Sequence, residues 1–489
     1  MFPSATPYIV ARPLPQRGKQ LALFTIVTLE VLAICVPPIW WGTLALSLLV
    51  FTALVAILIV TVRGQGDALV LGWLLIFPLG YYYLSFPRGR ALIGLDRVFV
   101  CVLMLAACFA GQQRHVRIPT LLRNSAISWS FFMLVAAATI PVAVVPISGL
   151  RVLLDAFLFP GLLAWYVLRY FDVRRHFRVL HVIACVMAVY VGAIGIGEVA
   201  LQRDLLATPD STIFLAGDYS AAQSTEILVR PNGPFSSTNS FALIGLVSLC
   251  FIPFLGSVQK EALPRWQRLL QNVAMVAALL TAIMPLFRSV FVSLGIILLV
   301  GAYYSRGLRR QVRIAAISFF ILLALVLRLA LPQIFAERSD PTNLYGRIAE
   351  QRQVLMMFLD HPLFGVGLNN FYFAAQSGKY TAYYEDVESV DYPHNNLSAV
   401  LSETGIFGLV PFVLSQVLLV LAFRRLCAGR KELLPVWTTF LFIFLGYWVN
   451  GMSLEAGYFS DLNLYYMCAL AILFKYGMNA SAPRLIDSY

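Results

Sequence analysis

Charged residues are scarce in this sequence. Asp, Glu, Lys and Arg make up only 12% of the 489 residues, whereas a soluble domain averages about 25%. Hydrophobic residues make up 60%, and apolar runs of about 17–25 residues recur along the chain, each long enough to cross about 30 Å of hydrocarbon. This composition excludes an ordinary soluble domain. It predicts an all-α integral membrane protein, a polytopic bundle of about 12–14 transmembrane helices.

Clustered cysteines and sequence repeats are also absent. Most of the seven cysteines lie inside apolar runs, and none forms a close pair with ligand spacing. Neither a disulfide framework nor a metal site is therefore predicted. The first 20 residues are rich in proline and arginine and have no apolar core. They are expected to form a cytoplasmic tail and not a cleaved signal peptide.

The apolar runs predict fourteen spans. These are 21–38, 42–62, 68–86, 97–111, 126–147, 150–168, 179–200, 240–258, 269–285, 288–304, 314–331, 396–423, 433–451 and 462–476. The two runs on either side of Pro285-Leu286-Phe287-Arg288 are together too long for one helix. Their combined length suits a tight hairpin.

Lysine and arginine are unevenly distributed between the two sides. With the N-terminus inside, 24 of the 36 lie in inner segments and 12 in outer ones. Cytoplasmic loops are enriched in these residues, which supports this orientation and accounts for the net charge of +12 without a nucleic-acid partner. The predicted division is a cytoplasmic tail at 1–20, a transmembrane bundle at 21–200, a periplasmic loop at 201–239, helices with an Arg288 hairpin at 240–331, a large periplasmic loop at 332–395, C-terminal helices at 396–476 and a cytoplasmic tail at 477–489.

The larger outer loop contains an amphipathic stretch. Its apolar members are Ile348, Leu355, Phe358 and Leu359, and its polar members are Arg347, Glu350, Gln351 and Arg352. This spacing predicts a helix that lies on the membrane face or caps the bundle. His361-Pro362 should end the helix, and the glycine-containing residues 365–370 should form a bend.

Three arginines and one histidine stand out on the predicted outer side, where basic residues are normally depleted. They are Arg230, Arg288, Arg347 and His394. An arginine deep in a membrane costs at least about 2.5–3.5 kcal/mol on insertion scales, so we expect Arg288 to have an anionic partner.

Simpler interpretations exist for each of these residues. Arginines near helix ends commonly extend to lipid headgroups, and a loop histidine is commonly solvated. Pro393 and Asn395-Asn396 around His394 also suit an ordinary helix start. The acidic Glu385, Asp386, Glu388 and Asp391 fit a solvated run, and they lack the tight spacing of a divalent-metal site.

Taken together, the four residues indicate a different chemistry. Guanidinium groups bind phosphate oxygens in a bidentate fork and keep their charge, so several of them suit a diphosphate. A nearby imidazole suits removal of a proton from a sugar hydroxyl. A saccharide carried on a lipid diphosphate would use both features.

The chain also resembles the bacterial O-antigen ligase and O-antigen polymerase superfamily. The matching motifs are Gly346-Arg347, Asp360-His361-Pro362-Leu363-Phe364-Gly365-Val366-Gly367-Leu368-Asn369-Asn370-Phe371, His394-Asn395-Asn396-Leu397, Glu403-Thr404-Gly405-Ile406-Phe407-Gly408, Pro231-Asn232-Gly233-Pro234-Phe235 with Asn239, and Phe287-Arg288-Ser289. They cover about 230–410, and the first seven spans are similar only in hydropathy. In one departure, Phe287 stands where the family usually has a serine before the arginine.

The resemblance implies a metal-independent, inverting membrane glycosyltransferase without a cofactor. Such enzymes take a glycan from undecaprenyl diphosphate on the periplasmic side of the bacterial inner membrane. Ligases pass it to lipid A–core, and polymerases pass it to another lipid-linked repeat unit. On this chain, Arg288 and Arg347 would hold the diphosphate, Arg230 would be a further anionic contact, and His394 would be the base.

A lipid-linked oligosaccharide flippase is the alternative function. Many spans and basic segments suit a transporter, but transporter folds are commonly built from repeated halves. This sequence shows no similarity between its halves and has one outer loop of about 64 residues. The shared motifs leave the choice between ligase and polymerase open.

Overall fold

A computed structural model describes residues 66–80, 85–86, 93–109, 118–203, 205, 230–235, 237–259, 262–304, 341–389, 392–453 and 456–481. The spans expected at 21–38, 42–62 and 314–331 lie outside these residues, as does Asp391. The described part of the chain is almost entirely helical, which confirms the predicted all-α polytopic class.

Long helices alternate with short helical turns along the described part of the chain. In chain order the elements are α3 (Gly66–Gly80), β1 (Ser85–Phe86), β2 (Ile93–Gly94), α4 (Leu95–Phe109), α5 (Thr120–Thr139), η2 (Ile140–Val142), α6 (Pro146–Val152), a π-helical turn η3 (Leu153–Leu158), α7 (Phe159–Arg169), α8 (Val173–Leu201), α9 (Thr238–Ser257), α10 (Arg265–Ile283), α11 (Arg288–Tyr304), α14 (Thr342–Asp360), α15 (Phe371–Ala375), β3 (Tyr383–Tyr384), β4 (Val387–Glu388), α16 (Asn396–Cys427), η6 (Lys431–Leu433), α17 (Leu434–Gly451), η7 (Ala456–Tyr458) and α18 (Ser460–Ser481). The strands form two short antiparallel pairs, β1–β2 and β3–β4.

Six helical segments within the described residues are long and apolar enough to cross a membrane. They are Thr120–Val142, Pro146–Arg169, Val173–Leu201, Thr238–Ser257, Asn396–Cys427 and Lys431–Gly451, and Gly66–Leu79 and Arg288–Gly301 are shorter apolar helices. The expected break before Arg288 is present, because α10 ends at Ile283 and α11 begins at Arg288. The expected spans at 126–147 and 150–168 correspond to helices that start earlier, at Thr120 and Pro146.

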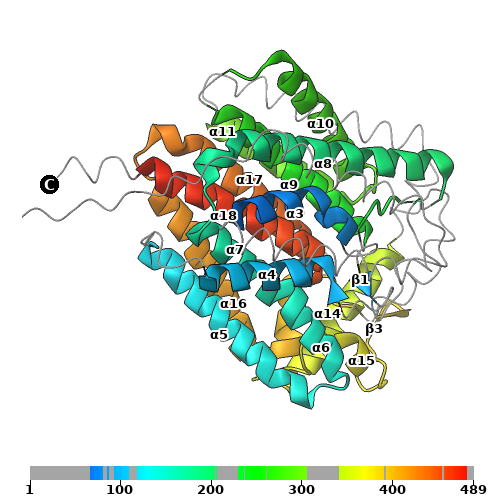
Figure 1. The fold of residues 1–489 in the computed structure, drawn as a ribbon. Coiled ribbons are helices and arrows are strands. Elements are labelled where there is room, and N and C mark those ends of the chain that lie inside the picture. The colour runs from blue at the N-terminus through cyan, green and yellow to red at the C-terminus, as the bar shows by residue number, and fades with distance from the viewer. Residues whose placement is uncertain are drawn as a thin grey trace, which may run out of the picture.

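The helices pack into one bundle, and the elements between 342 and 388 gather at one end of it. In Figure 1, α5 and α16 run side by side, whereas α14, α15 and β3 lie near the end of the bundle where α18 begins. Two serines of α5 bind carbonyls of α16: Ser125 donates to Ser415 at 2.7 Å and Ser128 to Pro411 at 2.9 Å. We call the end that contains α14 the site end.

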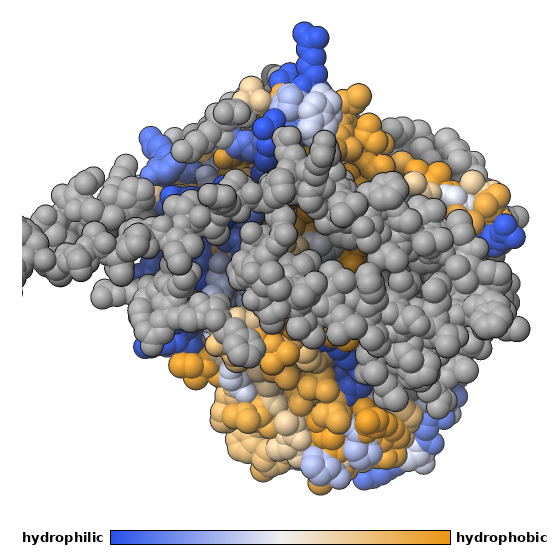
Figure 2. Space-filling view, viewed as in Figure 1, coloured by the Kyte–Doolittle hydropathy of each residue, from blue (hydrophilic) through white to orange (hydrophobic). Residues whose placement is uncertain are grey.

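The outward face of α5 is apolar. Ile127, Phe131 and Leu134 expose more than half of their surface, and Figure 2 shows apolar side chains gathered over this part of the molecule. Exposed leucines and phenylalanines in a continuous stretch would be costly in water. The face therefore suits contact with lipid.

Helix α16 is interrupted near its start, and a loop fills the interruption. Gly405 has φ 64° and ψ −166°, outside the helical region. The loop at 361–370 runs alongside, so that the Val366 N–H donates to Ser402 O and the Ile406 N–H donates to Pro362 O, both at 2.9 Å. Two motifs that lie about 40 residues apart in the sequence therefore share backbone hydrogen bonds.

Glycine is required on both sides of this contact. Gly365 and Gly405 both have positive φ, a region that residues with a Cβ avoid. A Cβ at Gly365 would lie 2.3 Å from the carbonyl carbon of Glu403, and one at Gly405 would lie 2.3 Å from that of Leu363. The loop can approach α16 this closely only without side chains.

We expect Gly365→Ala to lower both stability and activity strongly. Forcing alanine to positive φ costs about 1–3 kcal/mol, and the clash with fixed backbone atoms adds to that. Gly378→Ala is the matched control, because Gly378 also has positive φ but has open space around it. Thermal unfolding of the purified protein in detergent measures both. Equal losses in the two variants would show that close packing at Gly365 contributes nothing.

Candidate functional site

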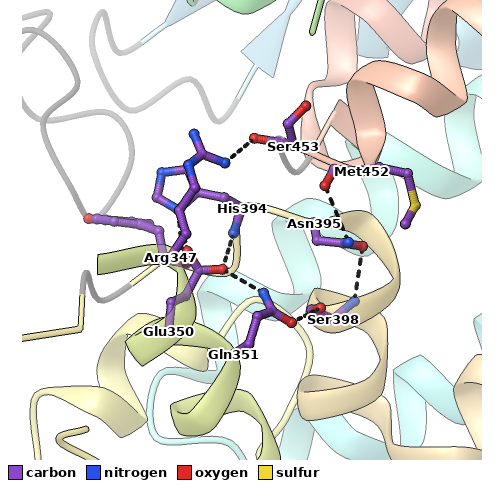
Figure 3. Close-up of polar contacts among 9 residues, drawn as sticks. Arg347, Glu350, Gln351, His394, Asn395, Ser398, Met452 and Ser453 are labelled. Atoms are coloured by element: carbon purple, nitrogen blue, oxygen red, sulfur yellow. Dashed lines mark hydrogen bonds and ion pairs between the residues drawn. The ribbon is translucent and has the colours of Figure 1, made fainter. Parts of the chain in front are cut away.

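His394 contacts a buried carboxylate from α14. The His394 Nδ1 atom lies 2.7 Å from Glu350 Oε2, and the His394 backbone N–H donates to Glu350 Oε1, also at 2.7 Å. The side chain of Glu350 is fully buried, and that of His394 is 14% exposed. Figure 3 shows the two groups facing each other between α14 and the residues that precede α16. One carboxylate thus fixes both the backbone and the ring of His394.

This contact favours one tautomer of the ring. A carboxylate accepts hydrogen bonds, so with Glu350 ionised Nδ1 is the nitrogen that donates to it. The Tyr392 carbonyl, 3.1 Å from Nδ1, is a second acceptor for the same proton. In the neutral ring, Nε2 is then the bare nitrogen, which can accept a proton.

Polar side chains also fix the start of α16 directly after His394. Asn395 Oδ1 accepts the N–H groups of Leu397 at 2.8 Å and Ser398 at 3.4 Å, which caps the helix. Ser398 donates to Gln351 Oε1 at 2.8 Å, and Gln351 donates to Glu350 at 3.1 Å. The ordinary helix-start interpretation is therefore correct for Asn395.

Arg347 lies one turn before Glu350 on α14, on the same side of the helix. Its side chain is exposed, and Nη1 donates to the carbonyl of Ser453 at 2.9 Å. Asn395 Nδ2 donates to the neighbouring Met452 carbonyl at 3.3 Å. The turn after α17 therefore contacts both the arginine and the residue next to His394 (Figure 3).

Arg288 lies at the same end of the bundle. Helices α11 and α17 pack antiparallel, since Tyr304 accepts from Trp437 at 2.9 Å and Ser293 accepts from Asn450 at 2.9 Å. The start of α11, where Arg288 lies, therefore points to the same end of the bundle as the turn after α17 that contains Ser453. Arg288 is exposed. No acidic side chain among the described residues forms an ion pair with it, so the expected anionic partner is not a described residue of this chain.

Arg230 lies beside the hairpin bend that precedes Arg288. Its guanidinium carbon is 5.8 Å from the centre of the Phe287 ring, a cation–π distance. The loop is anchored by Glu198 of α8, whose Oε2 accepts the Gly233 N–H at 2.8 Å. Phe287, the residue that departs from the family pattern, thus connects Arg230 to the bend. Arg347 lies beside His394 (Figure 3), and Arg230 lies over the ring of Phe287, which directly precedes Arg288 in the chain.

Two buried carboxylates were not singled out by the sequence. Glu350 was expected on the solvated side of its helix, yet it is buried while Leu355 and Leu359 are more than half exposed. Glu403 accepts the N–H groups of Asn369 at 2.7 Å and Phe371 at 3.2 Å and the Tyr458 hydroxyl at 2.6 Å. The sequence held one indication for Glu350: it follows Arg347 by three residues, which places the two side chains on the same side of a helix.

The other charged side chains described between 342 and 389 are exposed. Lys379 Nζ lies 2.6 Å from Asp360 Oδ2, and this hydrogen bond lowers the pKa of the Asp360 carboxyl. Glu385, Asp386 and Glu388 are also exposed. Within the described ranges, no group of three or more His, Cys, Asp or Glu side chains is arranged to hold a metal ion.

The fold and site define a multi-pass α-helical membrane protein with a basic, histidine-containing site at one end of the bundle. Residues 273–413 match the family model described as O-antigen ligase. The match confirms the resemblance to the O-antigen ligase and polymerase superfamily, and it supports glycan transfer of that general kind. It contains Arg288, Arg347, Glu350 and His394, whereas Arg230 lies upstream. No curated protein matches the chain.

Proposed function

We propose that this protein transfers a glycan from undecaprenyl diphosphate to a sugar hydroxyl at the periplasmic face of the bacterial inner membrane. The observation that carries the proposal is the position of His394. Its ring is held by Glu350 so that Nε2 can accept a proton, and Arg347 projects from the same helix. A base beside a fixed cation suits attack of a hydroxyl on a sugar diphosphate.

The proposed reaction is a single displacement. The acceptor oxygen forms a bond to the anomeric carbon, the bond from that carbon to the diphosphate oxygen breaks, and the configuration inverts. The hydroxyl proton passes to His394, and undecaprenyl diphosphate leaves with the bonding electrons. Arg288 and Arg347 stabilise the negative charge that grows on the leaving group, and Arg230 provides a further contact to this anionic group. No metal or cofactor takes part.

The acceptor distinguishes the two activities of the family. A ligase would use lipid A–core, and a polymerase would use another lipid-linked repeat unit. The motifs that match are common to both, and the upstream half of the chain lies outside the matched residues. The matching family model is described as O-antigen ligase, which favours the ligase-like reaction.

The test uses the purified full-length protein with lipid-linked repeat units, with and without lipid A–core. A ligase gives glycan on lipid A–core, and a polymerase gives longer lipid-linked chains without it. Release of undecaprenyl diphosphate should equal the new linkages formed. Movement of the lipid-linked unit across vesicle membranes without any new linkage would instead identify a flippase and refute the proposal.

A further inference from the structure

We propose that Glu350 is a positioning residue that sets the tautomer of His394, an inference that rests on the proposed function. Glu350 would touch neither donor nor acceptor. It acts through the imidazole ring, and its contacts determine which ring nitrogen faces the substrate.

Both carboxylate oxygens of Glu350 accept hydrogen bonds from neighbouring residues. Oε1 accepts from the His394 backbone N–H and from Gln351, and Oε2 accepts from His394 Nδ1. A fully buried carboxylate is stable only when hydrogen bonds replace its lost hydration. Because His394 supplies two of the three contacts, a buried and ionised Glu350 favours the tautomer with the proton on Nδ1.

Packing contacts hold α14 in place, so that Glu350 stays opposite His394. Val354 and Met357 follow Glu350 on the same face of α14 and pack on Phe371, Ala374 and Tyr380, which fixes this face of the helix. Ser398 of α16 holds Gln351. Glu350 therefore meets His394 on a rigid element, and the ring can reorient only if it breaks a short hydrogen bond in a dry environment.

Glu350→Gln tests the tautomer directly, because it keeps the size and removes the charge. The glutamine carbonyl can still accept the His394 backbone N–H. Its amide group then donates to Nδ1, so that the ring proton moves to Nε2 and the base is lost. We expect transfer to fall by about 10²–10⁴-fold, the range that general-base catalysis contributes. Glu350→Asp keeps the charge and should recover part of the activity.

The decisive measurement is independent of substrate. The chain has five histidines, so ¹⁵N-histidine labelling gives few ring signals, and His394→Asn identifies the one that belongs to position 394. We expect Nδ1 protonated and Nε2 bare in the unmodified protein, with the reverse in Glu350→Gln. Glu388→Gln, an exposed carboxylate on β4, is the control and should change neither signal nor transfer.

The outcomes separate this inference from the proposed function. An unchanged tautomer and near-normal transfer in a folded Glu350→Gln variant would overturn the role of Glu350, even if His394→Asn abolishes transfer. A reversed tautomer in Glu350→Gln, together with no glycan transfer by the unmodified protein, would support the positioning and refute the function. Thermal unfolding of both Glu350 variants shows that losses do not arise from an unfolded chain.

Discussion

Replacing Arg288 or Arg347 by alanine is expected to abolish product formation in a protein that still folds. Both side chains are exposed at the site end, so their removal leaves no buried cavity or buried unpaired group. Losing one preorganised electrostatic contact to a developing charge costs about 10²–10³-fold in rate. Transfer of a radiolabelled glycan by the purified variants measures the effect.

Lysine substitutions and a distant arginine sharpen this experiment. Lysine keeps the charge but cannot bind two phosphate oxygens in one plane, so Arg288→Lys and Arg347→Lys should retain intermediate activity. Arg265→Ala is the matched control, because Arg265 is exposed at the start of α10, whereas the site lies beyond the end of that helix. If the alanine variants at 288 and 347 transfer glycan as well as Arg265→Ala does, neither arginine binds the diphosphate.

Removing the imidazole at position 394 should reduce transfer by about 10²–10⁴-fold, the usual contribution of a general base. His394→Ala also leaves the buried Glu350 without its Nδ1 partner, and breaking a buried charged contact destabilises by about 3–5 kcal/mol. Activity of the His394→Ala variant therefore cannot separate loss of the base from loss of stability.

His394→Asn separates the two effects. The asparagine amide is attached to Cγ, as Nδ1 is in histidine, so it can donate to Glu350 while nothing replaces Nε2. We expect this variant to unfold at nearly the normal temperature and to be as inactive as His394→Ala. Near-normal transfer by the asparagine variant would exclude His394 as the base.

Among the described residues, long apolar runs predicted where most helices lie, because a membrane span needs no knowledge of its neighbours. The bend before Arg288 was predicted from total length, and the end of α14 was predicted from His361-Pro362. The cap at the start of α16 was predicted from Asn395. Each of these features depends on residues close together in the chain.

Features that depend on contacts between distant segments were not predictable in this way. The helical pattern around Glu350 was assigned a solvated polar side, because polar residues normally face water. In the structure this carboxylate faces His394, 44 residues later, and the leucines face outward. The approach of Gly365 to Gly405 was equally hidden, because a glycine in a sequence does not reveal what comes near it.

One helix, α14, carries two of the proposed functional side chains at this end of the molecule. Arg347 and Glu350 are separated by a single turn of α14, a spacing of about 4.5 Å along the axis that the helix does not allow to change. Any tilt that drew the guanidinium group towards a phosphate would carry the carboxylate with it and alter its grip on the imidazole. Under the proposed roles, capture of the donor by Arg347 and alignment of His394 by Glu350 would therefore be mechanically linked, and the base would be aligned best when the donor is bound.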